Sequence, residues 1–221
     1  MPASHWEDLL QEAFRIIDHV NTRNAGILSE WTFGGGTAMM LQIGHRESHD
    51  IDLFLNDAQL LAYVRASVSE MQFGLGPPAY GGDGSSYLKV AFEGLGEIDF
   101  IAASPITEDH TCRRVIQGRP VLLETIPEII AKKIAYRGPL IQPRDIFDIA
   151  AACRSGFQSE TEEALRNIRD CIPPVLKKLG TISPAYVEND IRQLAVRPEF
   201  QPLATDAMQI TQSILKTLQQ Q

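Results

Sequence analysis

Two aspartates, Asp50 and Asp52, flank a single isoleucine in the stretch "DIDLF". The stretch alternates apolar and polar residues, which indicates a β-strand. Side chains two residues apart point to the same face of a strand, about 6–7 Å apart along it. Two carboxylates in this arrangement can bind the divalent cations of two-metal phosphoryl transfer. The alternative is that both aspartates face water on a half-exposed strand.

A third aspartate, Asp99, lies in a second predicted strand, "GEIDFIA". If that strand pairs with "DIDLF", the three carboxylates converge on one point. Mg²⁺ suits such a site because it takes oxygen ligands and retains water and substrate phosphates in its shell. Both strands have the apolar flanks of buried strands, where an unpaired carboxylate is costly. The pattern therefore favours a metal site over a solvated strand.

Three glycines followed by Thr37 precede the aspartates, in "FGGGTAMM". They lie between a predicted strand and a predicted helix, so free backbone N–H groups there can bind a phosphate. Thr37 adds a hydroxyl donor or caps the helix. The sequence has neither the G-K-[ST] of a P-loop nor the G-x-G-x-x-G of a dinucleotide-binding fold. A tight turn is the alternative interpretation of the glycines.

The remaining elements follow from hydrophobic periodicity and turn residues. The first part mixes helices and strands: we expect helices over 5–24, 37–43 and 57–70, strands over 30–33, 50–55, 86–92 and 96–103, and a hairpin over 113–124 that turns at Gln117–Gly118. Residues 74–86 are rich in glycine and proline and are predicted to form an exposed loop. From Thr125 onwards the pattern is helical, with helices over 126–137, 144–154, 159–171, 184–194 and 206–219. We therefore predict an α+β protein with two domains, 1–124 and 125–221.

The net charge of −8 is unevenly distributed along the chain. Residues 1–110 carry 5 basic and 16 acidic side chains, whereas residues 111–154 carry 8 basic and 4 acidic ones. An acidic protein repels phosphates wherever no basic patch compensates, so residues 111–154 are the expected place for polyanion contact. The alternative is that Arg113, Arg114 and Arg119 form a solvated strand face.

The cysteines and the hydropathy indicate a cytoplasmic protein. Cys112, Cys153 and Cys171 are odd in number and form no C-x-x-C pattern, so neither a disulfide framework nor a zinc site is expected. No apolar run reaches the roughly 18–20 residues that span a bilayer, so no membrane partner is expected.

The glycines and aspartates together resemble the signature of the DNA polymerase β-like nucleotidyltransferase superfamily. Three stretches resemble the AbiEii/AbiGii toxin family within it: "GGGTAMMLQIGHRESHDIDLF", "EIDFIA" and "IIAKKIAYRGPLIQPRDIFDIAA". The resemblance covers about residues 30–155 and implies a nucleotidyltransferase core, with a mixed β-sheet flanked by helices, followed by a C-terminal helical bundle.

The resemblance also implies a chemistry: transfer of a nucleotidyl group from an NTP, with Mg²⁺, to an acceptor hydroxyl. Asp50, Asp52 and Asp99 would bind the metal, and Asp99 would also help to activate the acceptor. Lys133 would neutralise triphosphate charge. The implied nucleotide-binding residues are the glycine turn and three polar side chains: Gly35, Gly36, Thr37, Arg46, Ser48 and Lys89.

The residues around Lys133 agree in part with this assignment. Ile126, Ile130 and Ile134 form a predicted buried stripe, and Lys133 lies at its boundary, where it reaches a cleft or merely extends to solvent from the helix flank. Asp145 and Asp148 suit the start of the next helix, where they pair with Arg137 or Arg144 or take part in catalysis. His49, directly before the aspartates, is expected to pack.

Three functions remain open at this stage. The first is a toxin of a toxin–antitoxin or abortive-infection system that modifies RNA, such as a tRNA end, and has a cognate antitoxin. The second is a small-molecule nucleotidyltransferase, with acidic residues of 155–221 receiving a cationic acceptor such as an aminoglycoside. The third is a non-catalytic nucleotide-binding partner protein, which the intact set of aspartates and Lys133 argues against. The short C-terminal region leaves the acceptor undetermined.

Overall fold

A computed structural model describes residues 4–220, so the outermost residues of the two expected domains, 1–3 and 221, lie outside it. The chain forms two compact units. Within residues 4–220, the first, here called the sheet unit, contains residues 4–38, 48–105 and 111–124, and the second, the helical unit, contains residues 39–47, 106–110 and 125–220. The chain passes between the units at residue 125, where the sequence pattern changes, and also on either side of the two short segments 39–47 and 106–110.

The sheet unit is built on a mixed seven-stranded sheet in the order β3-β4-β5-β2-β1-β7-β6. β2 runs parallel to β5 and β1 runs parallel to β7, while the other neighbours are antiparallel. The strands are β1 Trp31–Gly34, β2 Ile51–Leu55, β3 Ala79–Gly82, β4 Tyr87–Phe92, β5 Gly96–Ala102, β6 Thr111–Ile116 and β7 Arg119–Glu124. The mixed sheet with flanking helices confirms the predicted α+β class.

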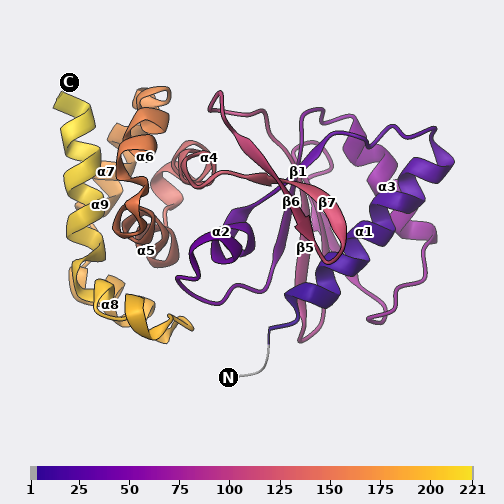
Figure 1. Ribbon diagram of the computed structural model, residues 1–221, viewed down its shortest axis with the longest axis horizontal. Coiled ribbons are helices and arrows are strands. Elements are labelled where there is room, and N and C mark those ends of the chain that lie inside the picture. The colour runs from indigo at the N-terminus through magenta and orange to yellow at the C-terminus, as the bar shows by residue number, and fades with distance from the viewer. Residues whose placement is uncertain (1–3, 221) are drawn as a thin grey trace. The chain divides into compact units, whose positions relative to one another are not determined.

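Two amphipathic helices, α1 (Trp6–Arg23) and α3 (Leu60–Glu70), pack against each other and against the central strands (Figure 1). Ile51, Leu53 and Leu55 of β2 are fully buried. Because side chains alternate along a strand, the residues between them, Asp52 and Phe54, lie on the opposite face and are only half-buried. The apolar face of β2 thus fixes where Asp52 points.

One prediction in this unit is wrong. Residues 79–82, expected within an exposed loop, form the edge strand β3, which pairs with β4 from Ala79–Ala91 to Gly82–Leu88. All four residues are exposed. Backbone pairing at a sheet edge requires no buried face, so the strand has no apolar alternation for sequence reasoning to detect.

The helical unit contains α4 (Ile126–Lys132), α5 (Pro143–Ala152), α6 (Gln158–Arg166), α7 (Ile172–Leu179), α8 (Pro184–Gln193) and α9 (Leu203–Gln220). α5 packs against α4, α8 and α9, which agrees with the burial of all of its residues except Arg144. This unit confirms the predicted helical C-terminal part.

Two helices differ from the predictions in detail. α7 was not expected, because its sequence contains two prolines; both lie in its first turn, where the missing N–H groups have no helical partner to lose. The predicted helix over 126–137 is present, but its last turn, Lys133–Arg137, is π-helical. Such turns occur most often at functional sites.

α2 (Gly35–Ile43) is shared between the two units. It begins in the sheet unit directly after β1, as the glycine turn predicts, and its last residues belong to the helical unit. Within residues 4–220, no helix combines the length and apolar character needed to cross a membrane. The three cysteines are free thiols, as expected.

Candidate active site

Four residues on four neighbouring strands form a row across the sheet. Lys89 of β4 lies opposite Asp99 of β5, Asp99 lies beside Asp52 of β2, and Asp52 lies opposite Gly34 of β1. The strand of Asp99 is therefore the direct neighbour of the strand of Asp52, which is the condition under which their carboxylates were expected to come together. The pairing brings two carboxylates side by side at the end of β1, where the glycine turn begins.

Gly35 is in direct contact with Asp52. A Cβ atom on Gly35 would overlap the carboxylate of Asp52, and the backbone of Gly35 has a φ of +68°. Only glycine satisfies both conditions without strain. The first turn of α2, whose N–H groups have no helical partners, thus lies against one of the two paired carboxylates.

Asp99 is an electrostatically strained group. Burial and the neighbouring charge of Asp52 raise its pKa to about 7, against the lowering effect of Lys89. Its Oδ1 atom is buried and has no hydrogen-bond partner within the described part of the chain. This oxygen is therefore available to bind a cation.

The Asp52–Asp99 pair fits Mg²⁺. The ion commonly binds through one or two carboxylates and completes its shell with water and substrate phosphates. The buried, unpartnered Oδ1 of Asp99 and the adjacent charge of Asp52 supply such a pair of ligands. Among residues 4–220, no group of three or more His, Cys, Asp or Glu side chains is placed to hold a metal ion.

Asp50 therefore lies differently from the expectation of three converging carboxylates. It precedes the first residue of β2, and its Oδ1 accepts a hydrogen bond from the backbone N–H of Glu97 at 3.2 Å. This hydrogen bond orients the carboxylate of Asp50 toward the start of β5. A role for Asp50 as a metal ligand stays a prediction.

Thr37 connects the glycine turn to the strand of the aspartates. Its buried hydroxyl donates to the backbone carbonyl of Asp50 at 2.6 Å. α2 begins at Gly35, so Thr37 lies inside the helix, and its expected role as the N-terminal cap is wrong. Its backbone N–H and that of Gly36 remain candidates for phosphate contact.

Lys89 is engaged with carboxylates. Its Nζ pairs with Glu97 and lies 3.5 Å from Oδ2 of Asp99. Burial opposes its charge, but the hydrogen bond to Glu97 and the charge of Asp99 together raise its pKa. Sequence reasoning missed Glu97, although Glu97 and Asp99 are two residues apart on one strand and so share a face.

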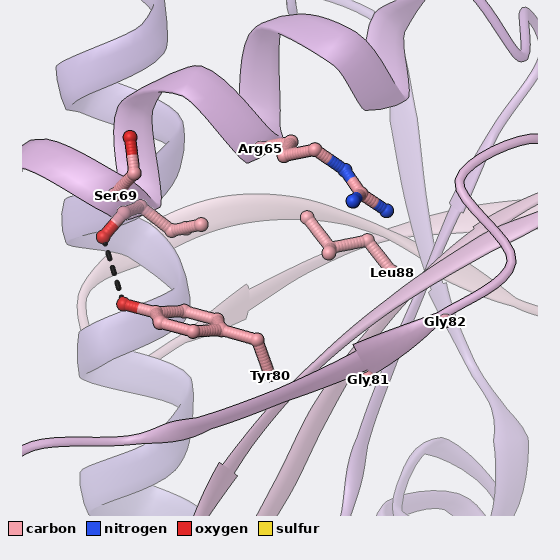
Figure 2. Close-up of a pocket in the computed structure, with 7 residues that line it drawn as sticks. Arg65, Ser69, Tyr80, Gly81, Gly82 and Leu88 are labelled. Atoms are coloured by element: carbon pink, nitrogen blue, oxygen red, sulfur yellow. Dashed lines mark hydrogen bonds between the residues drawn. The ribbon is translucent and has the colours of Figure 1, made fainter.

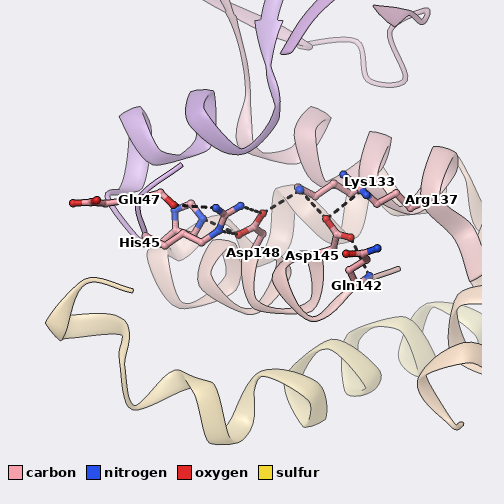
Figure 3. A network of polar contacts seen from close by, with 8 residues as sticks. His45, Glu47, Lys133, Arg137, Gln142, Asp145 and Asp148 are labelled. Carbon is pink, nitrogen blue, oxygen red and sulfur yellow. Dashed lines mark hydrogen bonds and ion pairs between the residues drawn. The ribbon is translucent and has the colours of Figure 1, made fainter. Parts of the chain in front are cut away.

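Arg46 and Lys133 meet at two aspartates of α5 within the helical unit (Figure 3). Nε and Nη2 of Arg46 donate to the two oxygens of Asp148 at 2.8 and 2.9 Å. Nζ of Lys133 lies 2.9 Å from Oδ1 of Asp145 and 3.0 Å from Oδ2 of Asp148. Arg137 also pairs with Asp145, at 3.3 Å, which confirms one of the expected pairings. Three cations thus face two carboxylates, leaving one positive charge in excess.

Most side chains of this network are buried. Both aspartates are fully buried, and the side chain of Lys133 is 10% exposed. Burial opposes ionisation of Asp148, yet the charges of Arg46 and Lys133 hold its pKa well below the usual value. Burial likewise opposes the charge of Lys133, but Asp145 and Asp148 raise its pKa. Asp148 and Lys133 are therefore both charged at neutral pH.

A role for Ser48 in nucleotide binding stays a prediction. Ser48 is nearly buried, and its backbone carbonyl accepts a hydrogen bond from the Ser4 hydroxyl at 3.0 Å.

An open pocket of about 260 Å³ lies between α3 and the edge strand β3, where Arg65 and Tyr80 extend toward it (Figure 2). None of the predicted site residues lines this pocket.

Gly35→Ala is expected to abolish Mg²⁺-dependent nucleotide binding, because its Cβ would displace the carboxylate of Asp52. Titration calorimetry with Mg²⁺ and ATP measures the loss. Gly118→Ala is the matched control: Gly118 also has a positive φ, +77°, but nothing lies within 4 Å of its added Cβ. Both variants lose stability by about 1 kcal/mol from backbone strain. Equal nucleotide affinity in the two variants would contradict the proposed contact.

Comparison with known proteins gives the chain a family. The model of the family described as nucleotidyl transferase AbiEii toxin, Type IV TA system, matches residues 23–213. MenT4, a nucleotidyltransferase toxin from Mycobacterium tuberculosis H37Rv, has a similar fold, with a TM-score of 0.50 and 18% identity over 97% of this chain and 86% of that one. JHP933 from Helicobacter pylori matches with a TM-score of 0.46 and 17% identity over 99% of this chain and 96% of that one. No curated protein sequence matches the chain.

Proposed function

We propose a donor, a metal and an acceptor for this chain, which belongs to the AbiEii toxin family of nucleotidyltransferases. It transfers a nucleotidyl group from an NTP to RNA, such as a tRNA end, and does so with Mg²⁺. The observation that carries the donor side is the contact of Gly35 with Asp52, which is itself paired with Asp99. One face of the sheet thus presents helix N–H groups for phosphates next to carboxylates for the accompanying cation.

Each of the proposed site residues has a separate role in binding or catalysis. The backbone of Gly35, Gly36 and Thr37 binds the triphosphate, and Asp52 and Asp99 bind Mg²⁺, which supplies neutralisation of phosphate charge when bound. Lys133 adds positive charge that stabilises the transition state. Arg137, whose side chain is 37% exposed, is the more accessible cation of that network.

The reaction exchanges a phosphoanhydride bond of the NTP for a phosphoester bond to the acceptor. The acceptor hydroxyl oxygen bonds to the α-phosphorus, the bond from that phosphorus to the bridging oxygen breaks, and pyrophosphate leaves. Asp99 takes the proton of the hydroxyl as the general base.

The acceptor proposal rests on β6. Arg113 and Arg114 are exposed on this edge strand, and no carboxylate pairs with either of them in the part of the chain that the structure describes. The third arginine of the basic segment, Arg119, pairs with Asp18. Two unpaired cations in a chain of net charge −8 offer a contact for a phosphate backbone. Membership of a Type IV toxin–antitoxin family also supports a cognate antitoxin as partner.

The test uses purified protein, Mg²⁺ and each NTP labelled at the α-phosphate, with total tRNA or an aminoglycoside as acceptor. We expect label in RNA, none in the aminoglycoside, and none after chelation of Mg²⁺ with EDTA. The double variant Arg113→Gln/Arg114→Gln is expected to weaken RNA labelling about 10-fold and to reduce its salt dependence, with NTP affinity unchanged.

A matched loss of charge serves as the control. Lys177 and Lys178 are adjacent residues of α7, and replacing both with Gln is expected to leave RNA labelling unchanged. Label in the aminoglycoside alone would replace the RNA proposal with the small-molecule one. Label in no acceptor, together with no Mg²⁺-dependent NTP binding, would refute both.

A further inference from the structure

The chain between the glycine turn and the metal-binding strand belongs to the helical unit. α2 begins with the glycine turn in the sheet unit, residues 39–47 belong to the helical unit, and Ser48 returns the chain to the sheet unit. The glycine turn and the strand of Asp52 are thus joined by a segment that belongs to the helical unit. An interaction that fixes residues 39–47 therefore fixes the last turns of α2 and the residue that precedes Ser48.

Asp148 of α5 holds this segment through side chains. It accepts two hydrogen bonds from the fork of Arg46, at 2.8 and 2.9 Å, and its Oδ1 lies 2.9 Å from Nε2 of His45 (Figure 3). A carboxylate only accepts hydrogen bonds, so Nε2 of His45 carries the hydrogen. Bidentate arginine–carboxylate pairs fix geometry as well as charge.

The backbone of the segment is held from a second side. Arg46 forms a β-bridge with Val196, the N–H of Glu47 donates to the carbonyl of Ala195 at 2.9 Å, and the N–H of Arg197 donates to the carbonyl of His45 at 3.0 Å. The segment therefore has the residues before α9 on one side and α5 on the other. It is not a free loop.

Burial makes the hold rigid. His45 is fully buried and Arg46 is 6% exposed. The ring of His45 stacks on the ring of Phe147, with 5.9 Å between their centroids, and packs edge-on against the ring of Phe200, with 6.4 Å between their centroids. Buried, charge-assisted hydrogen bonds of this kind open rarely, because each opening exposes unpaired charge to a low-dielectric interior.

We propose that His45 and Arg46 are positioning residues: through Asp148 they fix residues 39–47, which include the last turns of α2, the helix whose first turn carries the glycines. This inference rests on the proposed nucleotidyl transfer. It also replaces the role that the sequence suggested for Arg46, contact with the nucleotide, by one in which Arg46 acts from a distance. Asp148 also contacts Lys133 at 3.0 Å, so a single carboxylate fixes both the segment and this cation.

The test compares Arg46→Lys, His45→Leu and His45→Gln. Lysine retains the charge of Arg46 but cannot form the fork. Leucine removes the donor of His45, whereas glutamine places an N–H near the position of Nε2. In Arg46→Lys and His45→Leu we expect kcat to fall about 10- to 100-fold with the KM for NTP nearly unchanged, since misplacement and not lost contact is the defect. His45→Gln is expected to restore most of the activity.

Hydrogen exchange supplies a readout independent of catalysis. Backbone amides of residues 35–52 are expected to exchange about 10-fold faster in Arg46→Lys and His45→Leu than in the unsubstituted protein. Thr211→Val is the matched control: the buried Thr211 hydroxyl donates to the carbonyl of Ile146 in the same helix α5, at 3.1 Å, without touching the segment. It is expected to alter neither kcat nor exchange at residues 35–52.

The outcomes separate this inference from the proposed function. An increase in the KM for NTP at constant kcat in Arg46→Lys would overturn the inference and return Arg46 to the nucleotide. Unchanged exchange at residues 35–52, or equal acceleration in Thr211→Val, would overturn it as well. If the unsubstituted protein labels no acceptor, the proposed function fails, while the exchange measurements still decide whether the segment is held as described.

Discussion

Asp99→Asn is expected to abolish nucleotidyl transfer and, at pH 8 without divalent cations, to make the folded protein more stable. Burial and the charge of Asp52 raise the pKa of Asp99 from 3.8 to about 7. The stability associated with the protonated form is complete below the unfolded pKa and is lost as the pH rises through the folded pKa. At pH 8 the ionised group costs up to about 4 kcal/mol, from roughly 1.4 kcal/mol per pKa unit. Asparagine removes this cost together with the metal ligand and the proton acceptor.

Urea unfolding at several pH values measures the effect. At pH 8 we expect the variant to be more stable by about 1–3 kcal/mol, less than the full cost because the side chain of Asp99 is 17% exposed and solvent screens its charge. The advantage should shrink as the pH falls below 7 and disappear near pH 4. Mg²⁺ should stabilise the unsubstituted protein and leave the variant unchanged. Lower stability of the variant at pH 8 would show that ionised Asp99 is not strained. A variant that Mg²⁺ still stabilises would show that Asp99 is not a ligand.

The faces on which Asp52 and Asp99 lie could be predicted from the sequence, because both residues lie in short apolar strands with alternating side chains, whereas the pairing of the two strands was only a condition of the metal site. Each strand buries its apolar face, which leaves its aspartate on the other face. The sequence did not reveal that the amide of Glu97 engages Asp50. Such a contact depends on the register between two strands, and the pattern within one strand contains no information about register.

The helix of Lys133 also forms contacts that its own sequence pattern does not predict. Its buried stripe, Ile126, Ile130 and Ile134, was predicted from spacing and is buried in the structure. The two aspartates that hold Lys133 come from the following helix, and their expected partners were Arg137 or Arg144 and not Lys133. The partner of Arg46, Asp148, lies 102 positions further along the chain. Side chains that meet through packing of distant elements leave no local signal in a single sequence.

Asp148→Asn is expected to have the largest effect on stability. Asp148 is fully buried between His45, Arg46 and Lys133, so the amide leaves two buried cations without their shared anion. Removing one partner of a buried ion pair costs about 3–5 kcal/mol. Chemical denaturation at pH 7 measures this loss. Glu188→Gln is the control, because Glu188 pairs with Arg192 at 2.7 Å on the surface, where the pair contributes little.

The pH dependence of this loss identifies its cause. Burial opposes the charge of Asp148, but Arg46 and Lys133 hold its pKa well below 3.8. A lowered pKa stabilises the folded state above the unfolded pKa, and this stability is lost as the pH falls through the folded pKa. The difference between the two proteins should therefore be constant from pH 8 to about pH 5 and shrink only below about pH 4. If it instead varied between pH 5 and 8, the charge of Asp148 would not be what holds His45, Arg46 and Lys133 together.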